Sequence, residues 1–229
     1  MVHCALFDLV GTLTDPEEGI TRCVAYALAH FGIEVSELRS LRKFIGPPLK
    51  DSFMEFYGLS EPDALAAIDK YRERFSAIGI FENRLYPGIE SVLSQLCGDG
   101  LTLAVASSKP EVYVKQILEH FNLSRFFTAV CGSELDGRRT DKAEVISYAL
   151  TALSSPPAAD CVMVGDRMHD IIGARKNSLR SVGVLYGFGS RVELLQAGAD
   201  RLAEAVSDVY DAISVMGNLG LRGRGESST

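Results

Sequence analysis

The sequence predicts an α/β fold in which a three-layer core, built on a parallel sheet, carries an inserted α-helical domain. Two observations lead to this prediction. Short apolar runs alternate with helical patterns over residues 85–215, and one further strand-like run, residues 2–7, is separated from them by a mostly helical stretch. With 229 residues, 47% of them hydrophobic and 23% charged, the chain has the length and composition of a globular protein.

The first two elements follow from residues 2–18. Residues 2–7 form a short apolar run that stops at Asp8, which is typical of a buried strand that enters a loop. A helix is expected to begin soon after it. Asp15 is a suitable N-cap, Pro16 fits the first helical position, and Glu18 completes a capping box.

Helical patterns then continue to residue 84, with a second capped helix expected from about Ser60. Four more strands are expected at residues 101–106, 128–131, 161–164 and 181–185, with helical segments between them. This alternation implies right-handed crossovers and a parallel sheet, and the first strand is placed most economically in that same sheet.

The helical stretch is therefore an insertion. We expect a core of residues 1–15 and 85–215, a helical cap of residues 16–84, and a flexible tail of residues 216–229. The tail is rich in Gly, Arg and Ser and has no apolar period.

Composition excludes several classes of function. The net charge of −7 leaves no broad cationic surface for nucleic acid, and no apolar run approaches the ~20 residues that a membrane span needs. The first residues enter a strand pattern without a leader, so a cytoplasmic location is expected. Five cysteines without a C-x-x-C spacing favour reduced thiols. Gly187-Phe188-Gly189 lacks the third glycine of a dinucleotide fingerprint and is expected to be only a turn.

Polar side chains follow several of the predicted strands. In an open parallel sheet, ligands bind beyond the carboxyl ends of the strands, so residues from distant parts of the chain meet there. Three acids beside one lysine need a further cation to offset their repulsion, and Mg²⁺, which prefers oxygen ligands, meets that need. The sequence therefore predicts phosphoryl transfer assisted by magnesium at a site that collects Asp8, Ser107-Ser108-Lys109, Lys142, Asp166 and Asp170.

These segments resemble, in order and spacing, the four signatures of the haloacid-dehalogenase-like hydrolases. Residues 8–15, Asp-Leu-Val-Gly-Thr-Leu-Thr-Asp, are similar to the first signature, and the others match Ser107, Lys142 and Gly165-Asp166 with Asp170. The resemblance covers the chain to about residue 210 and implies a Rossmann-like core. Residues 41–49 of the insertion resemble the phosphoglycolate-phosphatase-type branch, which has a small helical cap.

The resemblance also implies roles for individual residues. Asp8 would be the nucleophile that becomes an aspartyl phosphate, Ser107 would hydrogen-bond the phosphoryl group, and Lys142 would neutralise its charge. Magnesium would be held by Asp8, Asp166, Asp170 and the backbone carbonyl of Val10. The remaining phosphate-binding residues would be Gly11, Thr12 and Ser108, and the cap residues that reach a second anionic group of the substrate would be Arg42 and Lys43.

Val10 departs from the pattern of the family. Most phosphatases of the family have Asp two residues after the nucleophile, where it protonates the leaving oxygen and later activates the hydrolytic water. A positioned general acid raises the rate about 10²–10⁴-fold, which corresponds to a reduction of roughly 3–5 kcal/mol in the activation free energy. We therefore expect reduced activity in a chain that carries Val10.

The expected function is magnesium-dependent hydrolysis of a small phosphomonoester. Phosphoglycolate is the first candidate substrate, and nucleotides or phosphotyrosine are the next candidates. Val10 leaves two alternatives open. One is an inactivated variant that serves as a ligand-binding or regulatory protein. The other is a phosphonate hydrolase, whose Schiff-base lysine would be Lys43 or Lys50. The retained Asp166 and Asp170 argue against a dehalogenase, which needs no magnesium.

Overall fold

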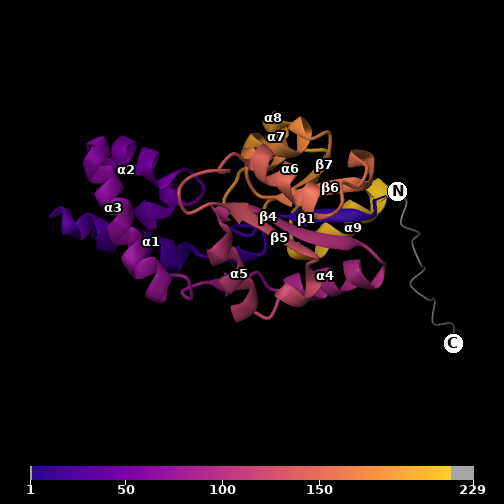
Figure 1. The fold of residues 1–229 in the computed structure, drawn as a ribbon, viewed down its shortest axis with the longest axis horizontal. Coiled ribbons are helices and arrows are strands. Elements are labelled where there is room, and N and C mark those ends of the chain that lie inside the picture. The colour runs from indigo at the N-terminus through magenta and orange to yellow at the C-terminus, as the bar shows by residue number, and fades with distance from the viewer. Residues whose placement is uncertain (1, 218–229) are drawn as a thin grey trace.

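Six parallel strands form the central sheet of the computed structural model, which describes residues 2–217 (Figure 1). Their order across the sheet is β5-β4-β1-β6-β7-β8, and helices cover both faces, which confirms the α/β class and the Rossmann-like core. The strands are β1 (Cys4–Phe7), β4 (Thr102–Pro110), β5 (Ala129–Ser133), β6 (Cys161–Gly165), β7 (Arg180–Val184) and β8 (Arg201–Ala203).

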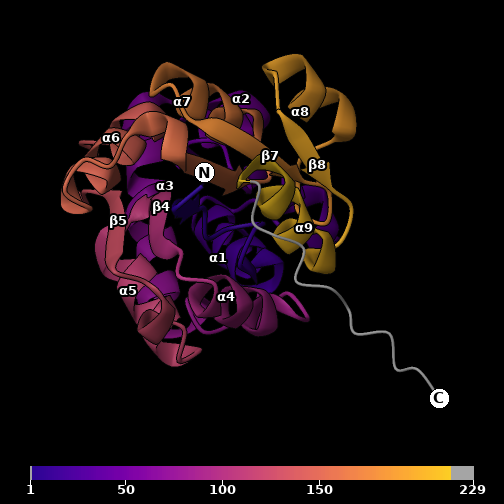
Figure 2. The same cartoon turned by 90° about the vertical axis from the view of Figure 1, so that its right-hand side faces the viewer.

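Alternate residues of each strand point to opposite faces of the sheet, so each strand contributes to two apolar layers. In β1, Ala5 and Phe7 belong to the larger cluster, whereas Cys4 and Leu6 belong to the smaller one. The helices of the larger layer are α4 (Ile89–Gly98), α5 (Glu111–His120) and α9 (Val206–Gly217). The opposite face is covered by α6 (Lys142–Ala152) and α7 (Met168–Lys176), with α8 (Arg191–Ala197) packed against α7 (Figure 2).

The helical insertion lies beside the carboxyl ends of the strands (Figure 1). It contains α1 (Glu17–His30), the 3₁₀ helix η1 (Leu38–Phe44), α2 (Leu49–Tyr57), α3 (Glu61–Arg74) and the π-helix η2 (Phe75–Gly79). The chain leaves and re-enters the core through an antiparallel pair, β2 (Thr14–Asp15) with β3 (Arg84–Leu85). Because this pair joins both connections, we propose residues 16–84 as the cap domain.

The start of α1 differs from the sequence prediction. Asp15 Oδ1 accepts a hydrogen bond from the Glu17 N–H at 3.0 Å, but Pro16 occupies the N-cap position without a side-chain cap. Asp15 is already part of β2, and Glu18 pairs with Arg22 at 2.9 Å, so the predicted capping box is wrong. The cap of α3 is confirmed, since Ser60 Oγ accepts the Asp63 N–H.

Other expectations concern the ends of the chain and its cysteines. Residues 216 and 217 of the predicted tail end α9, and residues 218–229 lie outside the described residues. The five cysteines are free thiols. Among residues 2–217, no helix combines the length and apolar character needed to cross a membrane. The short strand β8 was not anticipated, because three residues give too little alternation to detect.

Replacement of Leu93 by Ala is expected to destabilise the core by about 2–5 kcal/mol, since the side chain is fully buried on α4 and its loss leaves a cavity. Leu195→Ala on α8 is the matched control, because that side chain is 54% exposed and its removal costs about 0.5 kcal/mol or less. Urea unfolding followed by circular dichroism measures both changes. Equal shifts of the two unfolding midpoints would contradict the assignment of the core.

Candidate active site

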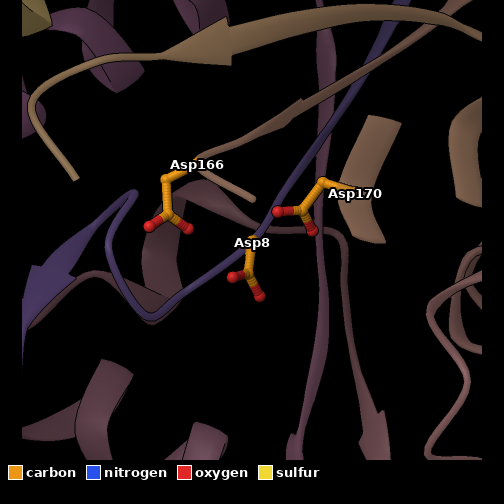
Figure 3. Close-up of side chains that lie close together, drawn as sticks. All are labelled: Asp8, Asp166 and Asp170. Carbon is orange, nitrogen blue, oxygen red and sulfur yellow. The ribbon is translucent and has the colours of Figure 1, made fainter. Parts of the chain in front are cut away.

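Three carboxylates meet at the carboxyl edge of the sheet. Asp8 directly follows β1, Asp166 directly follows the neighbouring strand β6, and Asp170 lies in the first turn of α7. Figure 3 shows the three side chains converging from these separate elements. Each contributes an oxygen within 4.8 Å of the others, and all three residues are buried.

Lys142 is the cation at the centre of this cluster. It is the first residue of α6, whose N-cap is the Asp141 side chain. The Lys142 Nζ lies 2.8 Å from Asp8 Oδ1 and 2.8 Å from Asp170 Oδ1, and it donates to the Ala106 carbonyl of β4 at 3.1 Å. One buried ammonium therefore links β1, β4 and α7, but it offsets only part of the charge of three acids.

The pKa values reflect this surplus of negative charge. Burial raises the pKa of Asp166 well above its usual value, and the charges of Asp170 and Asp8 raise it further. Burial also raises the pKa of Asp170, although Lys142 opposes that shift. Burial by itself lowers the pKa of Lys142, but the two neighbouring carboxylates outweigh this effect and leave the pKa above its ordinary value.

The cluster fits a hard divalent cation. Asp166 Oδ1 is buried and has no hydrogen-bond partner among the described residues, although a buried polar atom normally has one. Three carboxylates supply oxygen ligands of the kind that such cations prefer. The side chains of Asp8, Asp166 and Asp170 would hold the ion. The predicted use of the Val10 carbonyl stays a prediction.

Close packing of glycines fixes the position of Asp166. The Phe188 N–H donates to Asp166 Oδ2 at 2.7 Å, and a Cβ atom on Gly187 would lie 2.4 Å from the Cβ of Asp166. Gly11, at a φ of 77°, faces the same carboxylate, and a Cβ there would lie 2.1 Å from Asp166 Oδ2.

The segment Gly187-Phe188-Gly189 is therefore more than the simple turn that its sequence suggested. It follows β7, the strand next to β6, so its backbone reaches the carboxylate that follows β6. The position of the segment after a predicted strand was the signal that could have identified it.

The predicted phosphate-binding residues lie in the loops after β1 and along the end of β4. Ser107 is buried, and its Oγ accepts the Lys109 N–H at 3.4 Å. The Ser108 carbonyl accepts a hydrogen bond from the Ser133 hydroxyl at 2.8 Å. Thr12 Oγ1 is buried without a hydrogen-bond partner in the described part of the chain. Phosphate binding by these groups remains a prediction.

The two predicted cap residues have different surroundings. Arg42 Nε lies 3.2 Å from Glu17 Oε2, and its guanidinium carbon lies 5.8 Å from the centre of the Phe188 ring, close to the loop that holds Asp166. Lys43 instead lies over an aromatic ring of the cap itself, with its Nζ 4.4 Å from the centre of the Phe56 ring. Substrate contact by Arg42 and Lys43 therefore remains a prediction.

Hydrogen bonds connect the cap to the core on two sides of the site. Arg167, in the loop before α7, donates through Nη1 to the Ile45 carbonyl at 3.1 Å. Arg72 of α3 donates through Nη2 to the Leu135 carbonyl at 3.2 Å. The cap therefore contacts the loops that follow β6 and β5.

Replacement of Gly187 by Ala is expected to weaken divalent-ion binding about 10–100-fold, because the new methyl group displaces Asp166. The measurement is the Mg²⁺ concentration at the midpoint of the rise in melting temperature. Gly98→Ala is the control, since no atom lies within 4 Å of a Cβ there. An unchanged Mg²⁺ midpoint in Gly187→Ala would show that the packing around Asp166 does not govern the ion site.

Comparisons with known proteins agree with this geometry. The family model described as haloacid dehalogenase-like hydrolase matches residues 5–184. A 5'-nucleotidase of Pseudomonas aeruginosa is 52% identical over 189 residues, which are 82% of this chain and 85% of the relative. The tyrosine-protein kinase PtkA of Mycobacterium tuberculosis is 40% identical over 184 residues, 80% of this chain and 62% of the kinase.

Two further similarities concern proteins described as phosphatases. A phosphoglycolate phosphatase of Agrobacterium fabrum is 31% identical over 190 residues, 80% of this chain and 81% of the relative. The crystal structure of a predicted phosphatase from Clostridium acetobutylicum superposes with a TM-score of 0.88 and 51% identity, covering 93% of this chain and 99% of that one. The chain is an enzyme that belongs to the haloacid dehalogenase-like hydrolase family.

Proposed function

We propose that the chain is a Mg²⁺-dependent phosphomonoesterase that works through an aspartyl phosphate on Asp8. The observation that carries this proposal is the cluster in which Asp8 pairs with Lys142 at 2.8 Å and lies beside Asp166 and Asp170. The names of the relatives support it, because a 5'-nucleotidase and a phosphoglycolate phosphatase both hydrolyse phosphomonoesters.

The first chemical step is attack by an Asp8 carboxylate oxygen on phosphorus. The Asp8 O–P bond forms, and the ester P–O bond breaks and releases an alkoxide, which takes a proton from solvent water. Lys142 holds Asp8 in place and offsets negative charge on the phosphoryl oxygens, while the Ser107 hydroxyl donates a hydrogen bond to one of them. Bound magnesium would supply further positive charge beside these oxygens. Water then attacks phosphorus and loses a proton to solvent, the Asp8 O–P bond breaks, and inorganic phosphate and the Asp8 carboxylate are released.

Val10 cannot act as a general acid or base in this scheme, because its side chain carries no ionisable group. The backbone around it keeps a tight turn, since the Gly11 N–H donates to the Thr14 carbonyl at 2.8 Å and the Thr14 N–H to the Leu9 carbonyl at 2.9 Å. These bonds do not involve the side chain of residue 10. The nucleophile therefore keeps its position while the alcohol leaves without a general acid, and turnover is low.

The proposed substrate is a small phosphorylated metabolite, with phosphoglycolate as the first candidate. Hydrogen bonds from the cap to two core loops support this choice, because a cap that packs against the core favours small substrates. Nucleoside monophosphates are the second candidate, supported by the name of the relative at 52% identity. A panel that contains both kinds of compound distinguishes them.

The alternative functions differ in how far the side chains support them. Both lysines suggested for a phosphonate hydrolase interact within the cap, Lys43 with the Phe56 ring and Lys50 with Glu61 at 2.9 Å, which disfavours that function. A ligand-binding or regulatory protein is favoured by one observation, the hydrophobic Val10 side chain two residues after Asp8.

Replacement of Val10 by Asp is expected to raise Mg²⁺-dependent hydrolysis of ethyl phosphate about 10²–10⁴-fold, because the poor leaving group needs a proton. The gain with 4-nitrophenyl phosphate is smaller, since 4-nitrophenolate leaves as an anion. Phosphate release measures both rates, and the double substitution Asp8→Asn with Val10→Asp is the inactive control. Equal gains on the two esters would contradict the view that Val10 removes a general acid. If neither the chain with Val10 nor the Val10→Asp variant hydrolyses either ester, the ligand-binding function is favoured.

The chain with Val10 is also expected to accumulate phosphorylated Asp8, because water attack on the acyl phosphate lacks a general base. Intact-mass analysis after incubation with 4-nitrophenyl phosphate and Mg²⁺ detects this adduct. The Asp8→Asn variant is the control and forms none. An equal adduct in that variant would place the covalent phosphate on another residue.

A further inference from the structure

Lys109 is a cation on the same edge of the sheet as the carboxylate cluster. It lies two residues after Ser107 in β4, and the Ser107 Oγ accepts its backbone N–H. β4 is the neighbour of β1 in the sheet, and Asp8 directly follows β1. Lys109 and Asp8 therefore lie at the carboxyl ends of two adjacent strands.

The Lys109 ammonium faces the cap. Its Nζ lies 4.4 Å from the centre of the ring of Phe75, the first residue of η2. That ring is held firmly, because it stacks on Tyr71 at 5.3 Å and meets Tyr113 edge-on at 5.3 Å. Lys109 therefore lies between the end of β4 and the segment that leads from α3 of the cap back to the core.

Lys109 differs from the neighbouring cations in having no acidic partner. Within residues 2–217, its Nζ makes no hydrogen bond or ion pair, whereas Lys142 pairs with two carboxylates and Arg42 with Glu17. Burial lowers the pKa of Lys109 to about 8, against the opposing effect of Asp8. Lys109 is only partly buried, and its contact with the aromatic ring leaves the ammonium able to bind an anion.

We propose that Lys109 determines substrate specificity by binding a second anionic group, a carboxylate, on the molecule whose phosphoryl group reaches Asp8. The proposal rests on the proposed phosphatase function. It assigns to a core residue the role that the sequence suggested for Arg42 and Lys43 of the cap. A compact ammonium at the end of the strand next to β1 suits a carboxylate that is only a few bonds from phosphorus.

The test compares 2-phosphoglycolate, which carries such a carboxylate, with ethyl phosphate, which does not. In the Val10→Asp background, the ratio of kcat/KM for the two compounds measures discrimination. Lys109→Met is expected to lower this ratio at least tenfold, mainly through a higher KM for 2-phosphoglycolate, and Lys109→Arg to keep most of it. Lys115→Met is the control, because Lys115 lies on the exposed side of α5 and pairs with Glu111.

Each outcome decides one of the two proposals. A ratio that Lys109→Met leaves unchanged, with both compounds hydrolysed, overturns the role of Lys109 and leaves the phosphatase function standing. If Val10→Asp hydrolyses neither compound, the phosphatase function fails, and calorimetric binding to the chain with Val10 then tests Lys109. Tighter binding of 2-phosphoglycolate than of ethyl phosphate, lost in Lys109→Met, supports the assignment. Equal binding or no binding of both compounds overturns it.

Discussion

The active site depends on the pairing of one buried ammonium with several buried carboxylates. Lys142 contacts Asp8, Asp170 and the Ala106 carbonyl, so a single side chain joins two strands and a helix at the edge of the sheet. Removal of one partner from such an arrangement leaves an uncompensated buried charge, which is strongly destabilising. The excess of acids over this lysine is also the feature that fits a divalent cation.

Glycine makes this concentration of charge geometrically feasible. Asp166 and Asp170 fit against the backbone only where side chains are absent, at Gly11, Gly165 and Gly187. The carboxylates are consequently fixed before any ligand arrives, and little rearrangement is needed to bind an ion or a phosphoryl group. The same packing explains why a loop after β7, remote in sequence from the signatures, belongs to the site.

The cap contacts the core through hydrogen bonds and an aromatic ring. It forms hydrogen bonds with the loops after β5 and β6, and its Phe75 ring lies 4.4 Å from the Lys109 Nζ. Asp8 is held by Lys142, whereas residue 10 is a valine without an ionisable side chain. Loss of the proton donor affects the rate of bond cleavage, whereas the cations that surround the substrate govern binding, so the two properties are separable.

The sequence by itself determined the α/β class, most strands and the set of residues at the edge of the sheet. Apolar runs specify strands, and parallel strands end at one edge, so Asp8, Lys142 and Asp166 had to approach one another. Only the tertiary structure decided which of the candidate cations have partners. It paired Arg42 with Glu17, placed Lys43 on Phe56 and left Lys109 without an acid among residues 2–217, because such contacts depend on how the cap packs against the core. The capping box at Glu18 failed for the same reason, since pairing of Asp15 with Arg84 took precedence over local helix signals.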